Sequence, residues 1–394
     1  MPGQGGEHPE QLYDPPSHEP LVDRPWDPEQ VRRGIRAIAA DAEAAFDSRG
    51  WRAHPRDGAG GEQLEWASTV YLGGAGVVDA LHRLAGRGLI EPARSYVPYL
   101  DRPYRPDFPD ADHERSLWMG ETGIRLVLQR IAPSAANADR LAVLIGANAR
   151  DERRELMWGS PGTMLAAGAM HELTGEPRWL DLWRRSAAWL RDQCDPETGL
   201  WTQRLYGQVT RWIGPAHGFA GCVLALSADA GDDQQRQAAA VVRRLAVERD
   251  GLANWPPRAE GGLGRGGAST RVQWCHGAPG IVASLAEIAP GDGEHERLLL
   301  AGGELTWQAG PLVKGANLCH GTAGNGHAFL ALFRRTGDEL WLARARAFAM
   351  HALAQVERDR AAFGFGHYSL WTGDLGAALY LADCLDGRCR LPLP

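Results

Sequence analysis

The sequence predicts an all-α fold, an α/α toroid of seven inner and seven outer helices, and three observations lead to this prediction. Apolar residues recur at three- and four-residue steps in long segments. Long runs of alternating β-branched residues are scarce. One glycine motif recurs seven times along the chain. The first two observations predict helices, and the third predicts how the helices are arranged.

Two segments carry the clearest helical pattern. In residues 180–194 and 342–356, apolar side chains occupy one face, and arginines lie between them. The apolar positions are Leu180, Trp183, Ala187, Leu190 and Cys194 in the first segment, and Leu342, Ala345, Ala349, Ala352 and Val356 in the second. This spacing is typical of amphipathic helices with one buried face.

The repeated motif is Gly-x-x-Gly followed by an apolar run. The seven copies begin at Gly73, Gly120, Gly159, Gly218, Gly277, Gly321 and Gly373, at intervals of 39 to 59 residues. Each interval has room for an outer helix, an inner helix and their loops. Two glycines at a helix entrance permit a tight turn and a close approach to a neighbouring helix.

Seven such units can close into a ring in which the inner helices begin at one common rim. The residues before each Gly-x-x-Gly then converge on one central site. An open helical solenoid with the same period is the alternative. We expect residues 1–27, which are rich in proline, glycine and acids, to form a flexible arm, and residues 28–394 to form a single toroid domain.

Composition and charge exclude several classes of function. The 394-residue chain is 44% hydrophobic, with a formal net charge of -7 and no long basic run, so nucleic acid is not an expected partner. No stretch of about 18 apolar residues predicts a membrane span. The first residues lack the basic and apolar regions of a secretory signal, so we expect a cytoplasmic protein whose six cysteines stay reduced.

Chemistry-bearing residues gather at the motif entrances. Cys275-His276 precedes Gly277, and Cys319-His320 precedes Gly321. In a closed ring the two thiols face each other, and an imidazole beside them completes a Cys-Cys-His set for Zn²⁺ with one open coordination position, as in catalytic sites. Either cysteine taken alone is more simply a buried core thiol. The other four cysteines, Cys194, Cys222, Cys384 and Cys389, lack this setting.

Three further residues are candidates for catalysis. His217, directly before Gly218, is interpreted as a proton-transfer group, with a fourth metal ligand as the alternative. Glu155, before Gly159, either orients that imidazole or caps a helix N-terminus. Arg271, four residues before Cys275, either binds an oxyanion or forms a salt bridge.

The segments WCHGAPGI, NLCHGTAGNGHAFL and AHGFAG resemble the lanthionine synthetase C-like (LanC) family, the lantibiotic cyclases and their relatives, over about residues 30–390. The resemblance implies the seven-fold α/α toroid. It implies zinc ligation by Cys275, Cys319 and His320, and proton transfer by His217. Glu155 matches a supporting acid that is often Asp in the cyclases, and Arg271 matches a basic active-site residue. His276 stands where some cyclases have Tyr, so it is a candidate for a role beside the ligands.

The resemblance also implies a reaction. A cysteine thiolate of a dehydrated precursor peptide adds to dehydroalanine or dehydrobutyrine and forms a thioether ring, in a pathway where a dehydratase is a possible partner. The segment ELMWGSPGTML, with Glu155, resembles instead the eukaryotic branch, which implies addition of glutathione or another free thiol to dehydroamino acids in proteins. A non-catalytic zinc scaffold of a modification complex is a third hypothesis. A glycosidase using Glu155 and Glu121 is a fourth, although it leaves the Cys-His-Gly pair unexplained.

Overall fold

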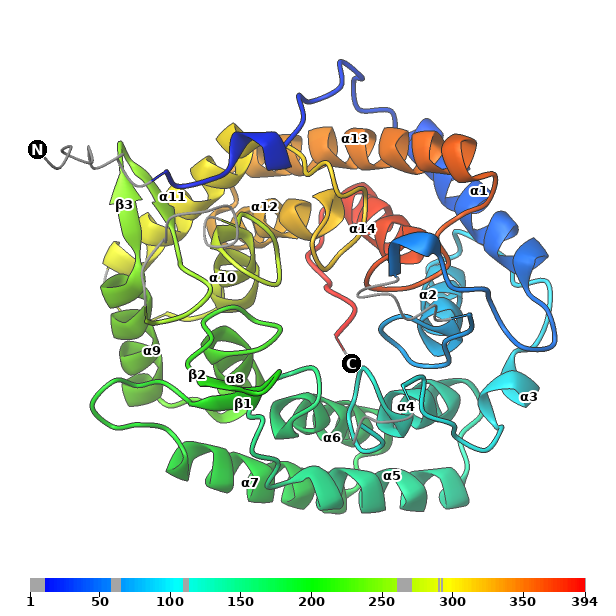
Figure 1. Cartoon of the computed structure of the whole chain (residues 1–394), viewed down its shortest axis with the longest axis horizontal. Coiled ribbons are helices and arrows are strands. Elements are labelled where there is room, and N and C mark those ends of the chain that lie inside the picture. The colour runs from blue at the N-terminus through cyan, green and yellow to red at the C-terminus, as the bar shows by residue number, and fades with distance from the viewer. Residues whose placement is uncertain are drawn as a thin grey trace, which may run out of the picture.

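Helices form two concentric rings in the computed structural model (Figure 1), which describes residues 11–57, 65–108, 113–260, 271–289, 291 and 293–393. The inner helices are α2 (Gly74–Gly86), α4 (Glu121–Ile131), α6 (Ser160–Thr174), α8 (Phe219–Leu226), α10 (Ala278–Leu285), α12 (Thr322–Thr336) and α14 (Asp374–Asp386). The outer helices are α1 (Pro28–Ala45), α5 (Ala135–Asn148), α7 (Pro177–Asp192), α9 (Asp232–Leu245), α11 (Gly293–Ala309) and α13 (Glu339–Phe363). The four-residue α3 (Val97–Leu100) takes the outer place between α2 and α4.

The inner ring is closed. Each inner helix contacts the next one along the chain, and the last, α14, contacts the first, α2. Three outer helices pack between successive inner helices: α5 against α4 and α6, α11 against α10 and α12, and α13 against α12 and α14. The prediction of an all-α toroid is therefore confirmed, and the open solenoid is excluded. The seven-fold outer ring is uneven because α3 is only one turn long.

The Gly-x-x-Gly repeats explain the closure. Every inner helix begins directly after the first glycine of a repeat, as α12 does after Gly321. At the second glycine, an added Cβ would overlap the carbonyl oxygen of the residue three positions before the first glycine, and this holds in all seven repeats. The same Cβ would press on the entrance of the preceding repeat: at Gly76 it would lie 2.7 Å from Cβ of Leu370. Only glycine permits this turn and this spacing between neighbours.

The two amphipathic segments form helices, although α7 ends at Asp192 and leaves Cys194 outside the predicted helix. In α7, Trp183, Ala187 and Leu190 are buried, while Arg184 and Arg185 on the other face are exposed. The apolar positions predicted in α13 are likewise buried. Burial of these side chains against the inner ring supplies most of the stability of such helices.

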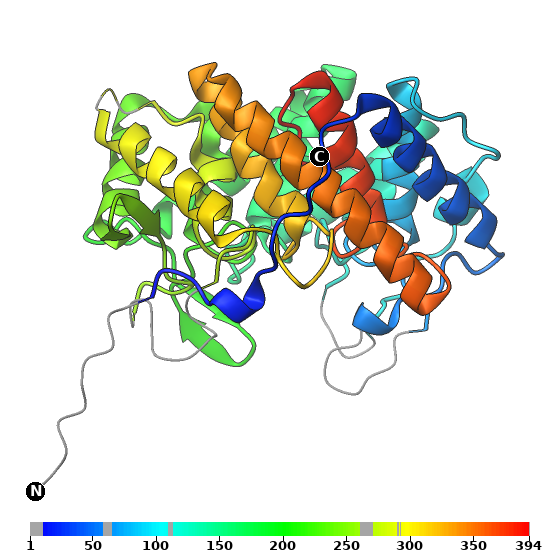
Figure 2. The same cartoon turned by 90° about the horizontal axis from the view of Figure 1, so that it is seen from above.

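Short strands and 3₁₀ turns lie in the segments outside the α-helices. Two antiparallel hairpins, β1 (Gln203–Leu205) with β2 (Gln208–Thr210) and β3 (Val247–Arg249) with β4 (Leu252–Asn254), turn through a residue and a glycine that both have positive φ, as two-residue hairpin loops require. Three 3₁₀ turns are η1 (Pro15–Ser17), η2 (Pro55–Asp57) and η3 (Ser227–Asp229). The β1–β2 hairpin projects from the lower edge of the ring in Figure 2. Among the described residues, no helix combines the length and apolarity that crossing a bilayer requires.

The N-terminal segment differs from the flexible arm expected over residues 1–27. Residues 11–27 lie against the ring: Leu12 is buried, and its carbonyl oxygen accepts a 2.6 Å hydrogen bond from Nδ2 of Asn254. The carboxylate of Glu19 accepts hydrogen bonds from His351 and Gln355 on α13. Leu12, Glu19 and backbone hydrogen bonds of Ser17 and Glu19 to Val313 and Pro311 anchor this segment, although its sequence shows no helical or strand period. Residues 1–10 lie outside the described part of the chain.

Candidate metal centre and active site

The two residues before the first glycine of each repeat, here called the entrance pair, form the floor of the site. The seven pairs are Tyr71-Leu72, Trp118-Met119, Met157-Trp158, Ala216-His217, Cys275-His276, Cys319-His320 and Trp371-Thr372. Backbone hydrogen bonds join the first members of neighbouring pairs. The N–H groups of Cys275, Cys319, Trp371 and Tyr71 donate in turn to the carbonyl oxygens of Cys319, Trp371, Tyr71 and Trp118, at 3.0, 2.9, 3.2 and 3.0 Å. Ring closure thus fixes the two cysteines directly beside each other.

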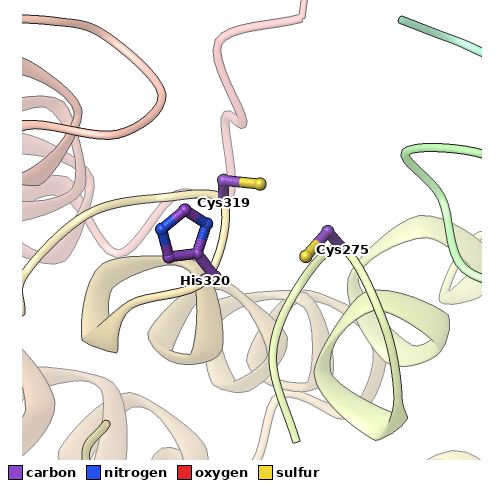
Figure 3. Close-up of side chains that lie close together, drawn as sticks. All are labelled: Cys275, Cys319 and His320. Atoms are coloured by element: carbon purple, nitrogen blue, oxygen red, sulfur yellow. The ribbon is translucent and has the colours of Figure 1, made fainter. Parts of the chain in front are cut away.

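Cys275, Cys319 and His320 meet at this floor, as the sequence pattern predicts. One ligand atom from each residue, the two Sγ atoms and an imidazole nitrogen, lies within 4.8 Å of the other two. Figure 3 shows the three side chains converging from the entrances of α10 and α12. Both thiols are buried, at 7% and 4% residual exposure, so the cluster is shielded from bulk solvent.

The donor set fits a zinc ion. Zinc binds thiolate at about 2.3 Å and imidazole at about 2.0 Å in tetrahedral geometry, which separates its ligand atoms by roughly 3.5 to 3.8 Å. Small side-chain adjustments bring the three atoms to that spacing. Polar hydrogens already face both sulfurs: Tyr71 Oη donates to Sγ of Cys319, and Gln273 Nε2 donates to Sγ of Cys275, each at 2.9 Å. Such donors stabilise thiolate ligands and hold them in place.

The ionisation of these groups also suits metal binding. A hydrogen bond from the Cys319 thiol, together with the nearby His217 and the Gln273 amide, lowers the pKa of Cys275 to about 7. The same hydrogen bond and burial raise the pKa of Cys319. The two thiols therefore titrate as a coupled pair that loses its first proton more easily than its second. Burial lowers the pKa of His320 to about 4, which keeps its imidazole in the neutral form that binds metals.

His217 and Glu155 form a buried pair. Nδ1 of His217 lies 3.0 Å from Oε2 of Glu155, whose residue is fully buried. The same carboxylate accepts three backbone N–H groups, from Met157 at 2.9 Å, Trp158 at 2.6 Å and Gly159 at 3.0 Å. Glu155 therefore does both things considered from the sequence: it holds the turn that leads into α6, and it binds the imidazole.

The rest of the His217 ring faces aromatic side chains. It stacks on Trp158 with ring centroids 5.2 Å apart, and Oη of Tyr206 lies 3.4 Å from Nε2. Because Glu155 takes Nδ1, only Nε2 is available for exchange of a proton with another molecule.

His217 and His320 line one cavity of about 460 Å³. The entrance pairs line it through Tyr71, Leu72, Met119, Met157, Trp158, His217, His320 and Thr372. Other walls come from Arg56, Asp57, Phe108, His113, Tyr206, Lys314, Asn317 and His367. The cavity thus reaches from His217 to His320, and its cationic wall includes Arg56 and Lys314.

His276 and Arg271 lie beside the cluster rather than along the cavity wall. The buried His276 ring packs against Trp212 at 5.4 Å and lies 6.2 Å from the His217 ring. Its pKa is held well below the usual range, first by burial, so it is neutral. The charge of Arg271 contributes to the low pKa of Cys275, and its backbone carbonyl accepts a hydrogen bond from Asn254.

Several residues at the site were not anticipated from the sequence. Tyr71 and Gln273 contact the sulfurs, Tyr206 contacts His217, and Asp57 and His367 line the cavity. Tyr71 carries a usable signal, because it stands two residues before Gly73, the position that Cys275 and Cys319 occupy in their own repeats. The hairpin residue Tyr206 and the η2 residue Asp57 carry no such signal.

The remaining cysteines and acids behave differently. Cys222 in α8 and Cys384 in α14 are fully buried in the core, as their apolar neighbours predict. Glu121 pairs with Arg125 and Arg140 and does not line the cavity. The two carboxylates required by the glycosidase hypothesis are therefore not brought together here.

Comparisons with known proteins agree with this architecture. Residues 208–391 match the family model described as lanthionine synthetase C-like protein. The chain is 39% identical over 124 residues to "Glutathione S-transferase LANCL1" of Danio rerio, covering 31% of this chain and 30% of that protein. It is 33% identical over 146 residues to "LanC-like protein GCL1" of Arabidopsis thaliana, covering 36% and 33%. The chain thus spans about a third of the length of the curated relatives it matches.

A solved structure extends the likeness to nearly the whole fold. Nisin cyclase superposes with a TM-score of 0.61 at 16% identity, covering 90% of this chain and 94% of that chain. Fold and site together define an α/α toroid with a Cys-Cys-His cluster at the entrances of its inner helices. Residues 208–391 carry a lanthionine synthetase C-like domain, and the fold of nearly the whole chain is that of nisin cyclase.

Proposed function

We propose that this protein is a zinc-dependent enzyme that adds a thiol to a dehydroamino acid, and that its substrate is a dehydrated precursor peptide in which it forms thioether rings. One observation carries the proposal: the two thiols cluster with the His320 imidazole, and His320 lines the same cavity as His217, whose ring is bound to the Glu155 carboxylate. Cys275, Cys319 and His320 are the proposed ligands. A dehydratase that supplies the substrate belongs to the same proposal as a possible partner.

The chemistry divides among these residues. Bound Zn²⁺ supplies the Lewis acidity that keeps an incoming thiol deprotonated near neutral pH. Addition forms a C–S bond at the β-carbon and moves the alkene electron pair toward the carbonyl oxygen as an enolate. His217, as the imidazolium, donates its Nε2 proton to Cα, while Glu155 keeps the charge and orientation of the ring. The cationic Arg271 stabilises the oxyanion electrostatically, and His276 positions the His217 ring.

Addition of glutathione to dehydroamino acids in proteins is the second candidate. Arg56 and Lys314 on the cavity wall give cationic partners for an anionic thiol. The relative named "Glutathione S-transferase LANCL1" and the use of Glu155 favour this candidate as well. A zinc scaffold without activity is the third, and the complete His217–Glu155 pair speaks against it.

A dehydrated model peptide with one cysteine and one dehydroalanine separates these candidates. The purified protein is incubated with the peptide, with and without glutathione, and the products are alkylated and weighed by mass spectrometry. A ring leaves the peptide mass unchanged and removes the site of alkylation, and we expect this product. A mass gain of one glutathione selects the second candidate. A His217→Ala variant with full activity would contradict the assigned proton donor.

A further inference from the structure

A second histidine–carboxylate pair lies on the same cavity. Nε2 of His367 lies 2.8 Å from Oδ2 of Asp57, and both side chains line the cavity together with His217 and His320. Asp57 ends η2, and His367 lies in the loop before α14, so the pair joins residues 310 positions apart in the chain. The mechanism proposed above does not use either residue.

The His367 ring is held firmly. Its backbone N–H donates to Oδ2 of Asp374 at 2.8 Å, and the backbone N–H of Asp374 donates back to the His367 carbonyl oxygen at 2.8 Å. His54 stacks on the imidazole with ring centroids 4.4 Å apart and planes inclined by 18°. His367 retains 9% exposure, so one limited part of the ring reaches open space.

The two pairs expose opposite ring nitrogens. His217 gives Nδ1 to Glu155 and keeps Nε2, whereas His367 gives Nε2 to Asp57 and keeps Nδ1. A carboxylate that accepts a hydrogen bond from one imidazole nitrogen fixes the proton of the neutral ring on that nitrogen. The other ring nitrogen then carries a lone pair. Nδ1 of His367 is not among the fully buried, unpaired polar atoms of the described residues, and the ring borders the cavity. This nitrogen can therefore accept a proton there.

We propose that His367, oriented by Asp57, accepts the proton of the incoming thiol, while His217 delivers a different proton to Cα. The inference rests on the proposed thiol addition. The thiol S–H bond breaks and an N–H bond forms on His367; the C–S bond then forms, and the N–H bond of the His217 imidazolium breaks as the Cα–H bond forms. Exchange with water in the cavity restores both rings. The sum is thiol plus alkene giving thioether, with no other reactant.

Charged and titratable groups from several segments surround His367 and affect its protonation. Asp57 and Asp374 are the acids that contact it, and His54 is the ring that stacks on it. Arg56, Lys314 and His320 line the same cavity as His367. Arg56 is itself paired with Asp359 of α13, which reduces its effect.

Kinetics against pH test the proposal. His367→Gln keeps a hydrogen-bond donor for Asp57 but removes the base, and Asp57→Asn keeps the shape but forces the His367 proton onto Nδ1. With a dehydroalanine peptide and N-acetylcysteine amide, we expect either variant to lower kcat/KM about 10- to 100-fold near pH 7. Near pH 9.5 the free thiol is already ionised, so the loss shrinks to about twofold. His351→Gln, which breaks a His–carboxylate pair with Glu19 outside the cavity, is the matched control and keeps the wild-type profile.

Binding calorimetry gives a readout independent of turnover. N-acetylcysteine amide is titrated into the zinc-loaded protein in buffers of different ionisation enthalpy, which counts the protons released. The wild type retains the thiol proton and releases close to none, whereas His367→Gln releases close to one. Equal proton counts and parallel pH profiles in wild type and both variants overturn the inference but leave the thiol addition intact. A wild type that neither binds nor adds a thiol overturns the proposed function and this inference together.

Discussion

Replacing Glu155 with Gln tests how one buried carboxylate serves both fold and chemistry. Oε1 accepts from the N–H groups of Trp158 and Gly159, while Oε2 accepts from Met157 and from Nδ1 of His217. An amide has only one acceptor oxygen. In its better orientation the new NH₂ faces the Met157 N–H and leaves that donor buried and unpaired.

The expected cost follows from these contacts. One unpaired buried N–H costs about 1–3 kcal/mol, and two remaining hydrogen bonds lose the assistance of a full charge. We expect Glu155→Gln to lower the free energy of unfolding by about 2–4 kcal/mol. The amide also donates to Nδ1 of His217, so the ring proton moves to Nε2. Without a carboxylate to stabilise the imidazolium, kcat falls by about 10²- to 10⁴-fold.

Three measurements check this prediction. Urea denaturation gives the free energy of unfolding, the thiol-addition assay gives kcat, and ¹⁵N chemical shifts of His217 report which nitrogen carries the proton. Glu19→Gln, at the outer pair with His351, is the matched control and keeps wild-type activity. A Glu155→Gln protein with unchanged stability and an unchanged His217 tautomer would refute the reasoning.

Three further predictions concern the ring, the ionisation of a buried acid and the thiolate donors. Gly324→Ala places a Cβ against the Leu318 carbonyl oxygen and lowers the free energy of unfolding by about 2–4 kcal/mol. Gly168 has open space around it, so Gly168→Ala leaves the free energy of unfolding unchanged or raises it by about 0.5–1 kcal/mol. Equal effects of the two substitutions in urea denaturation would contradict this packing argument. Burial raises the pKa of Asp374 to about 6, so the folded protein holds this proton more tightly than the unfolded chain and loses stability as pH rises from about 4 to 6. Asp374→Asn is expected to remove about 2–3 kcal/mol of this pH-dependent fall in the free energy of unfolding. An unaltered pH dependence of unfolding in the variant would contradict the assignment to Asp374. Tyr71→Phe removes the 2.9 Å donor to Cys319 and weakens zinc binding about tenfold in competition with a chelating dye; unchanged affinity would show that the donor is unimportant.

Much of the architecture was predictable because it depends on local backbone rules. The seven Gly-x-x-Gly copies mark seven turns in which a Cβ would strike a carbonyl oxygen, so the pattern is visible in every repeat. The same register predicts that Cys275 and Cys319 lie side by side, as the hydrogen bond between their backbones confirms. The shortened α3 was not predictable, because the chain between α2 and α4 is as long as other connections that hold full outer helices.

The parts of the site that sequence reasoning missed come from contacts between distant segments. Asp57 reaches His367 from a 3₁₀ turn, and Tyr206 reaches His217 from a hairpin tip. Neither residue stands in a repeated position. The anchoring of residues 11–27 was missed for a related reason, because it depends on Glu19 meeting His351 and Gln355 on α13. Composition predicts a flexible segment correctly only when no distant part of the chain binds that segment.

The zinc content of the purified, reduced protein tests the central claim most directly. Elemental analysis of the wild type is expected to give one zinc per chain, Cys319→Ala is expected to give almost none, and Cys194→Ala, a partly exposed thiol away from the cluster, is expected to keep one. A wild type that takes up no zinc, or a Cys319→Ala protein that retains it, would contradict the assignment of Cys275, Cys319 and His320 as its ligands.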